Sequence, residues 1–298
     1  MAYADSLPVD PTPVWRSTQA FEKMMAYYDS QLTQITVPYD SRYVDTRHGK
    51  THLLVVGDSA NPPLMLWHGM SINATAYINW FNLLADDFYI IAPDTLGDAG
   101  KSAPNRMDKR QSLAYGEWAA DVMDAMGIDR AHHAGVSQGG WLQLQLAAVA
   151  VEKMLSVSLV SSAGILPVSK MIPIKVLPWM IFGADAAAKR MVRVMSGVNE
   201  LNDPEMVKIF KLIFELKTEF GTPIMRDEDI RKLTAPTQLL MGEYEQTYPP
   251  HEVIQRAQSL LPDLRRAEIL PGMSHGMAEK PDLIPTMVRE FIHTTSQA

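Results

Sequence analysis

The sequence has no cysteine among its 298 residues. Disulfide bonds, thiolate metal sites and cysteine nucleophiles are therefore excluded. It also has no cluster of lysine and arginine, and its formal net charge is −7. Because surfaces that bind nucleic acid are basic, we expect no nucleic-acid partner.

Long uninterrupted apolar runs are missing as well. The most apolar long window, residues 171–188, is broken by Pro173, Lys175 and Pro178, so it does not predict a membrane span. The first residues carry neither the basic nor the apolar region of a secretory signal. We expect a cytoplasmic protein without stable membrane insertion. The oligomeric state stays open, and a homodimer is compatible with the sequence.

What the sequence does contain is an alternation of short apolar segments and segments with helical spacing. Apolar segments that alternate with helices are typical of a parallel sheet covered on both faces, so the predicted class is α/β. A hairpin through Gly49 joins strands at 39–45 and 51–56. Further strands are predicted at 63–67, 88–92, 131–136, 155–160, 236–241 and 266–270, and helices at 74–84, 112–126, 138–151, 251–260 and 281–293.

The alternation stops at residue 164 and resumes at residue 234. Between these points the pattern predicts helices, for example over 186–195 and 204–215, and no clear strand. We therefore expect one α/β core formed by 1–163 and 234–298, with 164–233 inserted as a helical cap.

The first part of the core begins with an extended arm over residues 1–14. A helix over 18–34 follows, with Phe21, Met24, Met25 and Tyr28 able to share one face. The sequence leaves open whether this helix packs on the core or covers a site.

Residues 135–139 read Gly-Val-Ser-Gln-Gly and fit the pattern G-x-S-x-G. A predicted strand precedes the pattern and a predicted helix follows it, which is the context of a nucleophile elbow. The turn exposes Ser137 at the start of the helix, where free N–H groups and the helix dipole favour developing negative charge. On this stretch alone, a capping serine in an ordinary strand-to-helix turn is the plain alternative.

The partners that a nucleophilic serine needs follow in the right order. A serine hydroxyl requires a general base, which an acid must orient. Glu243 and Glu245 come after the strand at 236–241, and His275 comes after the strand at 266–270. Because active groups gather at the carboxyl ends of parallel strands, we expect a catalytic triad in the order Ser, Glu, His. At this point either glutamate fits, and a surface or capping role is the plain alternative for His275.

An oxyanion hole needs two converging backbone N–H groups. Gln138 directly follows the serine, and Met70 follows Gly69, whose missing side chain permits close approach of the backbone. We expect a structural hydrogen-bonding role for the side chain of His68. Met70 also becomes a candidate for lining the substrate pocket. Trp179, Met180 and Phe182 of the cap are further pocket candidates, for which filling of the core is an equally good interpretation.

Two stretches imitate other sites. Gly100-Lys101-Ser102 resembles the end of a phosphate-binding loop, but that motif requires glycine where Thr95 stands. His132 and His133 are adjacent on a strand and therefore point to opposite faces. No carboxylate accompanies them at ligand spacing, so we expect no metal site and no cofactor.

Taken together, these motifs resemble those of the α/β-hydrolase superfamily, from about residue 47 to residue 293. The segment 46–52 and Glu245 are more narrowly similar to bacterial serine carboxylesterases. The resemblance implies that Glu245 rather than Glu243 is the acid. The motifs that carry it are His68-Gly69, Pro93-Asp94 with Gly97, Gly100-Lys101-Ser102, residues 135–139, Gly242-Glu243 with Glu245, and Gly272 with His275.

The resemblance implies a serine hydrolase that forms an acyl-enzyme on Ser137. We expect its substrates to be small-molecule carboxylic esters, small to medium in size and lipophilic. The first alternative is a C–C bond hydrolase with the same triad, and a less favoured one is a ligand-binding receptor on a hydrolase scaffold. Ser137 argues against haloalkane dehalogenases and epoxide hydrolases, which are similar but use an aspartate nucleophile.

Overall fold

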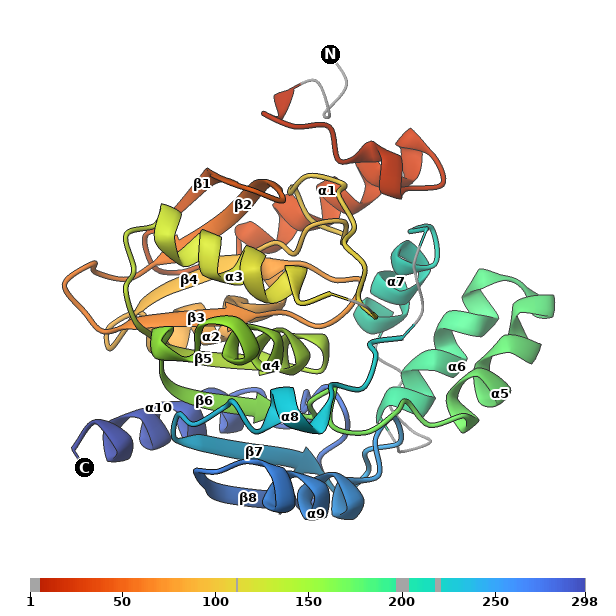
Figure 1. The fold of residues 1–298 in the computed structure, drawn as a ribbon. Helices are drawn as coiled ribbons and strands as arrows, with labels where there is room; N and C mark the ends of the chain where they lie inside the picture. Colours follow the sequence, from red (N-terminus) through yellow and green to blue (C-terminus); the bar gives the residue numbers. More distant parts are fainter. Residues whose placement is uncertain (1–5, 111, 197–203, 218–220, 298) are drawn as a thin grey trace.

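The computed structural model describes residues 6–110, 112–196, 204–217 and 221–297. Its centre is an eight-stranded sheet in the order β1-β2-β4-β3-β5-β6-β7-β8 (Figure 1). The pairs β1–β2 and β2–β4 are antiparallel, and the other neighbours are parallel. The predicted α/β class with a mostly parallel sheet is confirmed. The strands are β1 (Tyr39–Thr46), β2 (Gly49–Val56), β3 (Pro63–Trp67), β4 (Tyr89–Pro93), β5 (Ala131–Val136), β6 (Met154–Val160), β7 (Thr237–Gly242) and β8 (Leu264–Leu270).

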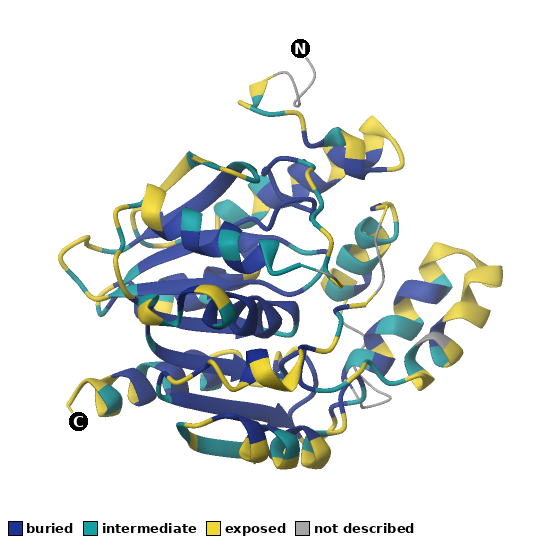
Figure 2. Cartoon of the chain, in the orientation of Figure 1, coloured by how far each residue is buried: buried dark blue, intermediate teal, exposed yellow. Residues whose placement is uncertain are grey.

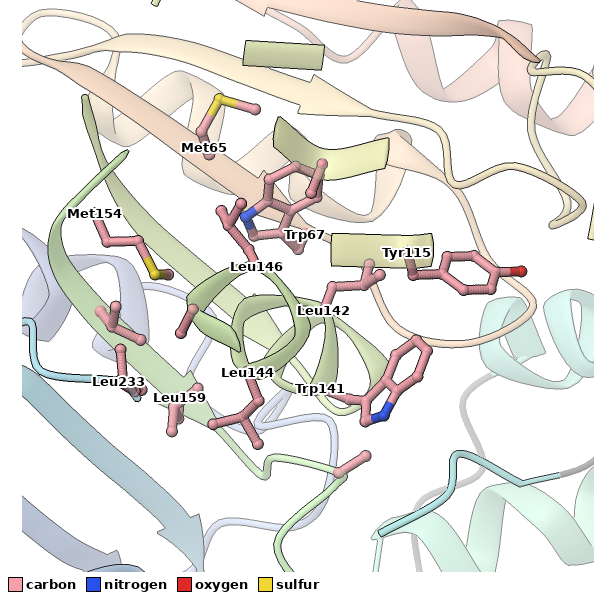
Figure 3. Packing of buried hydrophobic residues seen from close by; sticks show 14 of the residues in the cluster. Met65, Trp67, Tyr115, Trp141, Leu142, Leu144, Leu146, Met154, Leu159 and Leu233 are labelled. Atoms are coloured by element: carbon pink, nitrogen blue, oxygen red, sulfur yellow. The ribbon is translucent and has the colours of Figure 1, made fainter. Parts of the chain in front are cut away.

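The two faces of the sheet pack into separate apolar clusters, because successive strand residues point to opposite sides. In β3, Met65 and Trp67 join one cluster, whereas Leu64 and Leu66 join the other. Figure 3 shows the first cluster around α4, where Trp67, Trp141 and Leu142 lie together. The first cluster takes its helical residues mainly from α3 (Ala114–Ala125), α4 (Gln138–Ala150), α8 (Asp227–Ile230) and α9 (Pro250–Leu260), and the second from α1 (Thr18–Leu32), η3 (Ala74–Tyr77), α2 (Ile78–Leu84) and α10 (Leu283–Ser296).

The N-terminal helix packs on the core, which answers the question that the sequence left open. Phe21, Met24, Met25 and Tyr28 are all buried, so the predicted apolar face of α1 is confirmed. The arm before it includes the short helix η2 (Thr12–Val14), where the sequence predicts extended chain. Residues 1–5 of the predicted arm lie outside the described residues.

The named elements in the described chain between β6 and β7 are all helices. They are α5 (Met171–Val176), η5 (Leu177–Phe182), α6 (Ala184–Ser196), α7 (Pro204–Ile213) and α8. A small apolar cluster of Ala188, Val192 and Val207 joins α6 to α7. Figure 2 shows that this region is more exposed than the central strands. The predicted helices at 186–195 and 204–215 match α6 and α7, whereas α5 and η5 were not predicted separately.

No helix in the described ranges is long and apolar enough to cross a membrane. The broken apolar window at 171–188 forms α5, η5 and the start of α6. Pro178 stands in the first turn of η5. Backbone N–H groups in the first turn have no acceptor within the helix, so the missing N–H of proline costs no hydrogen bond there.

Two adjacent histidines on β5 are buried on opposite sides of the sheet. His132 Nδ1 lies 2.8 Å from the hydroxyl of Ser156. His133 Nδ1 accepts a hydrogen bond from Trp67 Nε1 at 3.1 Å, and the two rings stack. Burial lowers the pKa of His132 to about 4 and that of His133 to about 3. Both therefore stay neutral in the folded protein well below neutral pH.

These depressed pKa values predict a loss of stability in mild acid. The unfolded chain takes up protons near the ordinary histidine pKa of about 6.5, whereas the folded chain does so only near 4 and 3. Stability is therefore unaffected by these groups above about pH 6.5 and falls as the pH decreases below it. Lowering the pH from 7 to 5 should cost about 2 kcal/mol per histidine.

Urea unfolding at pH 7 and pH 5 measures this effect. Between pH 7 and pH 5 the free energy of unfolding of His132→Asn should fall by about 2 kcal/mol less than that of the wild type. The matched control is His251→Asn, because His251 is exposed, and it should behave like the wild type. An equal acid loss in His132→Asn and the wild type would contradict the prediction.

Candidate active site

The turn between β5 and α4 holds Ser137 in a strained conformation. Its φ of 56° and ψ of −114° lie in a region that residues with a side chain rarely adopt. The Ser137 N–H donates to Val160 O at 2.9 Å, and its carbonyl accepts from Ala163 N–H at 3.0 Å. The chain thus fixes the serine from the neighbouring strand β6. This is the geometry expected of a nucleophile elbow.

The glycines of the motif make the turn sterically feasible. A Cβ at Gly139 would lie 1.7 Å from the carbonyl oxygen of Trp67. A Cβ at Gly135 would lie 2.8 Å from the same oxygen. Only glycine allows β3 to approach the elbow this closely.

Gly139→Ala should therefore damage the fold. The added methyl meets backbone, which does not give way as a flexible side chain would, so we expect a loss of roughly 3 kcal/mol or more. Urea unfolding measures it. Gly276→Ala is the matched control, because a Cβ there meets nothing within 4 Å, and it should change stability by less than about 0.5 kcal/mol. Equal stability of the two variants would refute the steric account of the elbow.

Glu245 and His275 meet at the carboxyl ends of β7 and β8. Glu245 Oε2 lies 2.5 Å from His275 Nδ1, and both side chains are buried. The other carboxylate oxygen of Glu245 accepts from the N–H groups of Thr247 at 2.6 Å and Tyr248 at 3.3 Å. Burial alone would raise the pKa of Glu245, but His275 and the Thr247 N–H outweigh it and hold that pKa below its ordinary value. The carboxylate is therefore charged at neutral pH.

Glu243 has a different environment. It is exposed, and its carboxylate accepts a hydrogen bond from the N–H of Gly272 at 2.9 Å. Of the two glutamates that the sequence left open, only Glu245 contacts His275. The geometry therefore favours Glu245 as the acid.

Tyr248 lies beside Ser137 and His275. Its phenol is near enough to the Ser137 side chain for that side chain to lower the phenol's pKa, and its ring centre lies 5.9 Å from that of His275. Burial and the charge of Glu245 raise the pKa of the phenol, so it stays protonated. Within the described ranges no hydrogen bond joins Ser137 directly to His275, and such contacts are often long before substrate binds. No motif in the sequence marks Tyr248, although it stands only three residues after Glu245.

The two segments proposed for the oxyanion hole lie beside the serine. Gln138 is the first residue of α4, and the first four N–H groups of a helix have no acceptor within it. A Cβ at Gly69 would lie 3.8 Å from the Cβ of Ser137, so the loop that carries Met70 runs next to Ser137. The His68 ring binds this loop, since Nδ1 lies 2.7 Å from Gly69 O and Nε2 accepts from Thr95 N–H at 2.9 Å.

The pocket candidates separate into two places. Met70 lines a small cavity with Asp98, Arg106 and Lys109, among others. The other three candidates do not line it, and they are exposed: Trp179 by 42%, Met180 by 47% and Phe182 by 74%. Contact of these three with substrate stays a prediction. Asp98 and Lys109 line this cavity although no motif in the sequence marks them.

The stretch that imitates a phosphate loop supports Asp94 instead. Asp94 accepts hydrogen bonds from the N–H groups of Ala74 and Lys101 and lies 2.8 Å from His52 Nδ1. Burial opposes its ionisation, but these contacts outweigh burial and lower its pKa to about 2. A Cβ at Gly100 would lie 2.3 Å from Asp94 Cγ. The glycine is therefore required for packing. In the part of the chain that the structure describes, no group of side chains could hold a metal ion.

The chain matches proteins of known fold. A family model described as alpha/beta hydrolase fold matches residues 62–187. A Bacillus subtilis (strain 168) protein named as the uncharacterized carboxylesterase nap is 28% identical over 284 residues, which cover 89% of this chain and 91% of that protein. The crystal structure of carboxylesterase CesB (YbfK) from Bacillus subtilis has a TM-score of 0.80 at 26% identity, covering 92% of this chain and 98% of that one.

A more distant match shares the fold alone. The meta-cleavage product hydrolase from Pseudomonas fluorescens IP01 has a TM-score of 0.71 at 21% identity, covering 85% of this chain and 97% of that one.

The sheet order, the strained turn at Ser137 and these matches define the class of protein. The chain has the α/β-hydrolase fold and is similar to members of the α/β-hydrolase superfamily. Within that superfamily it is similar to bacterial carboxylesterases along most of its length.

Proposed function

We propose that the protein is a serine hydrolase that cleaves carboxylic esters through an acyl-enzyme on Ser137. The observation that carries the proposal is the buried pair of Glu245 and His275, 2.5 Å apart, at the sheet edge where Ser137 stands in its strained turn. Similarity to bacterial carboxylesterases supports it independently.

The proposed reaction needs only groups of this chain. His275 takes the proton of Ser137 as the hydroxyl attacks the ester carbonyl, and Glu245 holds the imidazole with its proton on Nδ1. The N–H groups of Met70 and Gln138 stabilise the oxyanion. His275 then gives its proton to the leaving alcohol, and water hydrolyses the acyl-enzyme by the same route. No cofactor enters these steps.

We propose that residues 164–233 form a cap whose helices contribute to substrate choice. Its helix α6 reaches the site, where the backbone N–H of His275 donates to the backbone carbonyl of Met195 at 3.3 Å. Two of its lysines have partners, since Lys175 donates to the amide oxygen of Gln246 and Lys189 pairs with Asp185. The apolar side chains of residues 171–182 favour neutral lipophilic esters over acidic substrates. The cytoplasmic location and the oligomeric state stay predictions.

The substrate assay compares p-nitrophenyl acetate, butyrate and octanoate with a vinylogous diketone. We expect turnover of the esters that depends on Ser137, with the chain-length preference reporting the pocket. A 2-hydroxymuconate semialdehyde hydrolase of Pseudomonas sp. (strain CF600), which is 34% identical over 106 residues, makes C–C bond cleavage the second candidate. Faster turnover of the diketone than of every ester would favour that second candidate.

A further inference from the structure

One buried carboxylate contacts both segments that carry the proposed oxyanion donors. Asp98 lies in the loop after β4 and is only 8% exposed. Its Oδ1 accepts a hydrogen bond from the N–H of Ser71 at 3.2 Å, and its Oδ2 accepts one from Nε2 of Gln138 at 2.8 Å. Ser71 directly follows Met70, and Gln138 directly follows Ser137. Asp98 therefore joins the Met70 loop to the start of α4.

The groups around Asp98 fix the direction of each hydrogen bond. Gln138 is fully buried, and its Oε1 accepts from Lys109 Nζ at 3.0 Å. The amide therefore presents its N–H to Asp98 and its oxygen to Lys109. From Asp98 to Lys109 the groups alternate: the carboxylate accepts from the Gln138 N–H, and the Gln138 oxygen accepts from the ammonium group. The carboxylate and the ammonium thus bracket one neutral amide.

The loop of Asp98 is itself held firmly. Asp98 N–H donates to Thr95 O at 3.1 Å, and Gly97 N–H donates to Ala103 O at 2.9 Å. On the other side, Ser71 has a φ of 63°, which a residue with a side chain adopts only when its surroundings hold it. The hydrogen bond from Ser71 to Asp98 is one such restraint.

We propose that Asp98 is a positioning residue that sets the distance between the Met70 and Gln138 N–H groups. This inference rests on the proposed function, because it assigns those N–H groups to an oxyanion hole. Such donors act by being fixed before the reaction, so a small displacement weakens them most in the transition state. Asp98 touches neither the substrate nor the reacting atoms in this role.

The first test is Asp98→Asn, which keeps size but replaces one acceptor with a donor. The new amide still accepts from Ser71 with its oxygen, but its N–H₂ group then faces the N–H₂ group of Gln138. We expect kcat on p-nitrophenyl butyrate to fall about 10- to 100-fold with KM changed less than about threefold. Affinity for an aryl boronic acid, which mimics the tetrahedral state, should weaken by a similar factor.

The matched control is the double variant Asp98→Asn/Gln138→Glu, which exchanges the two groups and keeps the net charge. The new amide then donates to the new carboxylate, and that carboxylate still accepts from Lys109. The Gln138 backbone N–H is unchanged. We expect the exchange to recover most of the kcat and of the boronic acid affinity, whereas Gln138→Glu alone sets two carboxylates against each other and loses activity.

Thermal melting accompanies every assay, so that a loss of folding is recognised. If the wild type is active and Asp98→Asn has the same kcat, the positioning role is overturned and the esterase function stands. A double variant as impaired as Asp98→Asn, at a melting temperature equal to that of the wild type, would also overturn it. A wild type without activity that depends on Ser137 would overturn the proposed function and this inference together.

Discussion

Ser137→Ala should lower kcat on a simple aryl ester by roughly four to six orders of magnitude. Without the hydroxyl no acyl-enzyme forms, and the remaining oxyanion donors act only on direct attack by water. Alanine keeps the Cβ of serine, so the substitution adds no new steric strain to the turn with its φ of 56°. Steady-state release of p-nitrophenol measures the loss.

The stability of Ser137→Ala separates chemistry from folding. The turn is held by the backbone bonds to Val160 and Ala163, which the substitution leaves in place. We therefore expect a melting temperature close to that of the wild type. A folded Ser137→Ala variant that retains a tenth of the wild-type activity would contradict the nucleophilic role of Ser137.

Glu245→Gln should lower kcat about 10³- to 10⁴-fold. The carboxylate accepts the Nδ1 proton of His275 at 2.5 Å, which leaves Nε2 free to take the serine proton. An amide can instead donate to Nδ1, and the proton then sits on Nε2, where it blocks the general base. The loss should appear in kcat, because the group acts in the transition state and does not contact the substrate.

Glu243→Gln is the matched control for this prediction. Its carboxylate is exposed and binds only the Gly272 N–H among its described partners, so its kcat should stay within about twofold of the wild type. If Glu243→Gln were the more damaging of the two, the assignment of the acid would be wrong.

The sequence predicted the frame of the site well, because the frame depends on local patterns. Short apolar runs bounded by glycine and proline predicted the strands, and the structure has β3, β5 and β7 within a residue or so of the predicted bounds. The order of Ser137, a glutamate at 243 or 245, and His275 then followed from where those strands end. The choice between Glu243 and Glu245 came from a family resemblance, and the geometry favours the same residue.

The groups that support the site could not be predicted in the same way. Asp98 and Gln138 are 40 positions apart in the sequence, and their contact depends on how two loops meet at the sheet edge. No periodicity reports such a contact. Tyr248 was missed for a related reason, since it lies in the loop after β7 and only the fold brings its side chain near Ser137.

The segment at 171–182 shows the limit of the apolar pattern. Residues 171–182 are rich in apolar side chains, which fits a pocket wall, a buried core or an exposed surface equally well in sequence. In the structure Ile181 is 85% exposed and Phe182 is 74% exposed. Burial depends on which elements pack against a segment, and a single segment does not encode its neighbours.

Covalent labelling tests the proposed role of Ser137 as the nucleophile most directly. The protein would be incubated with an alkyl fluorophosphonate, and the modified peptide located by mass spectrometry in the wild type and in Ser137→Ala. We predict one adduct in the wild type, on the peptide that carries Ser137, and none in Ser137→Ala. An adduct of equal yield in Ser137→Ala, or a folded wild type that takes up no label, would contradict the account.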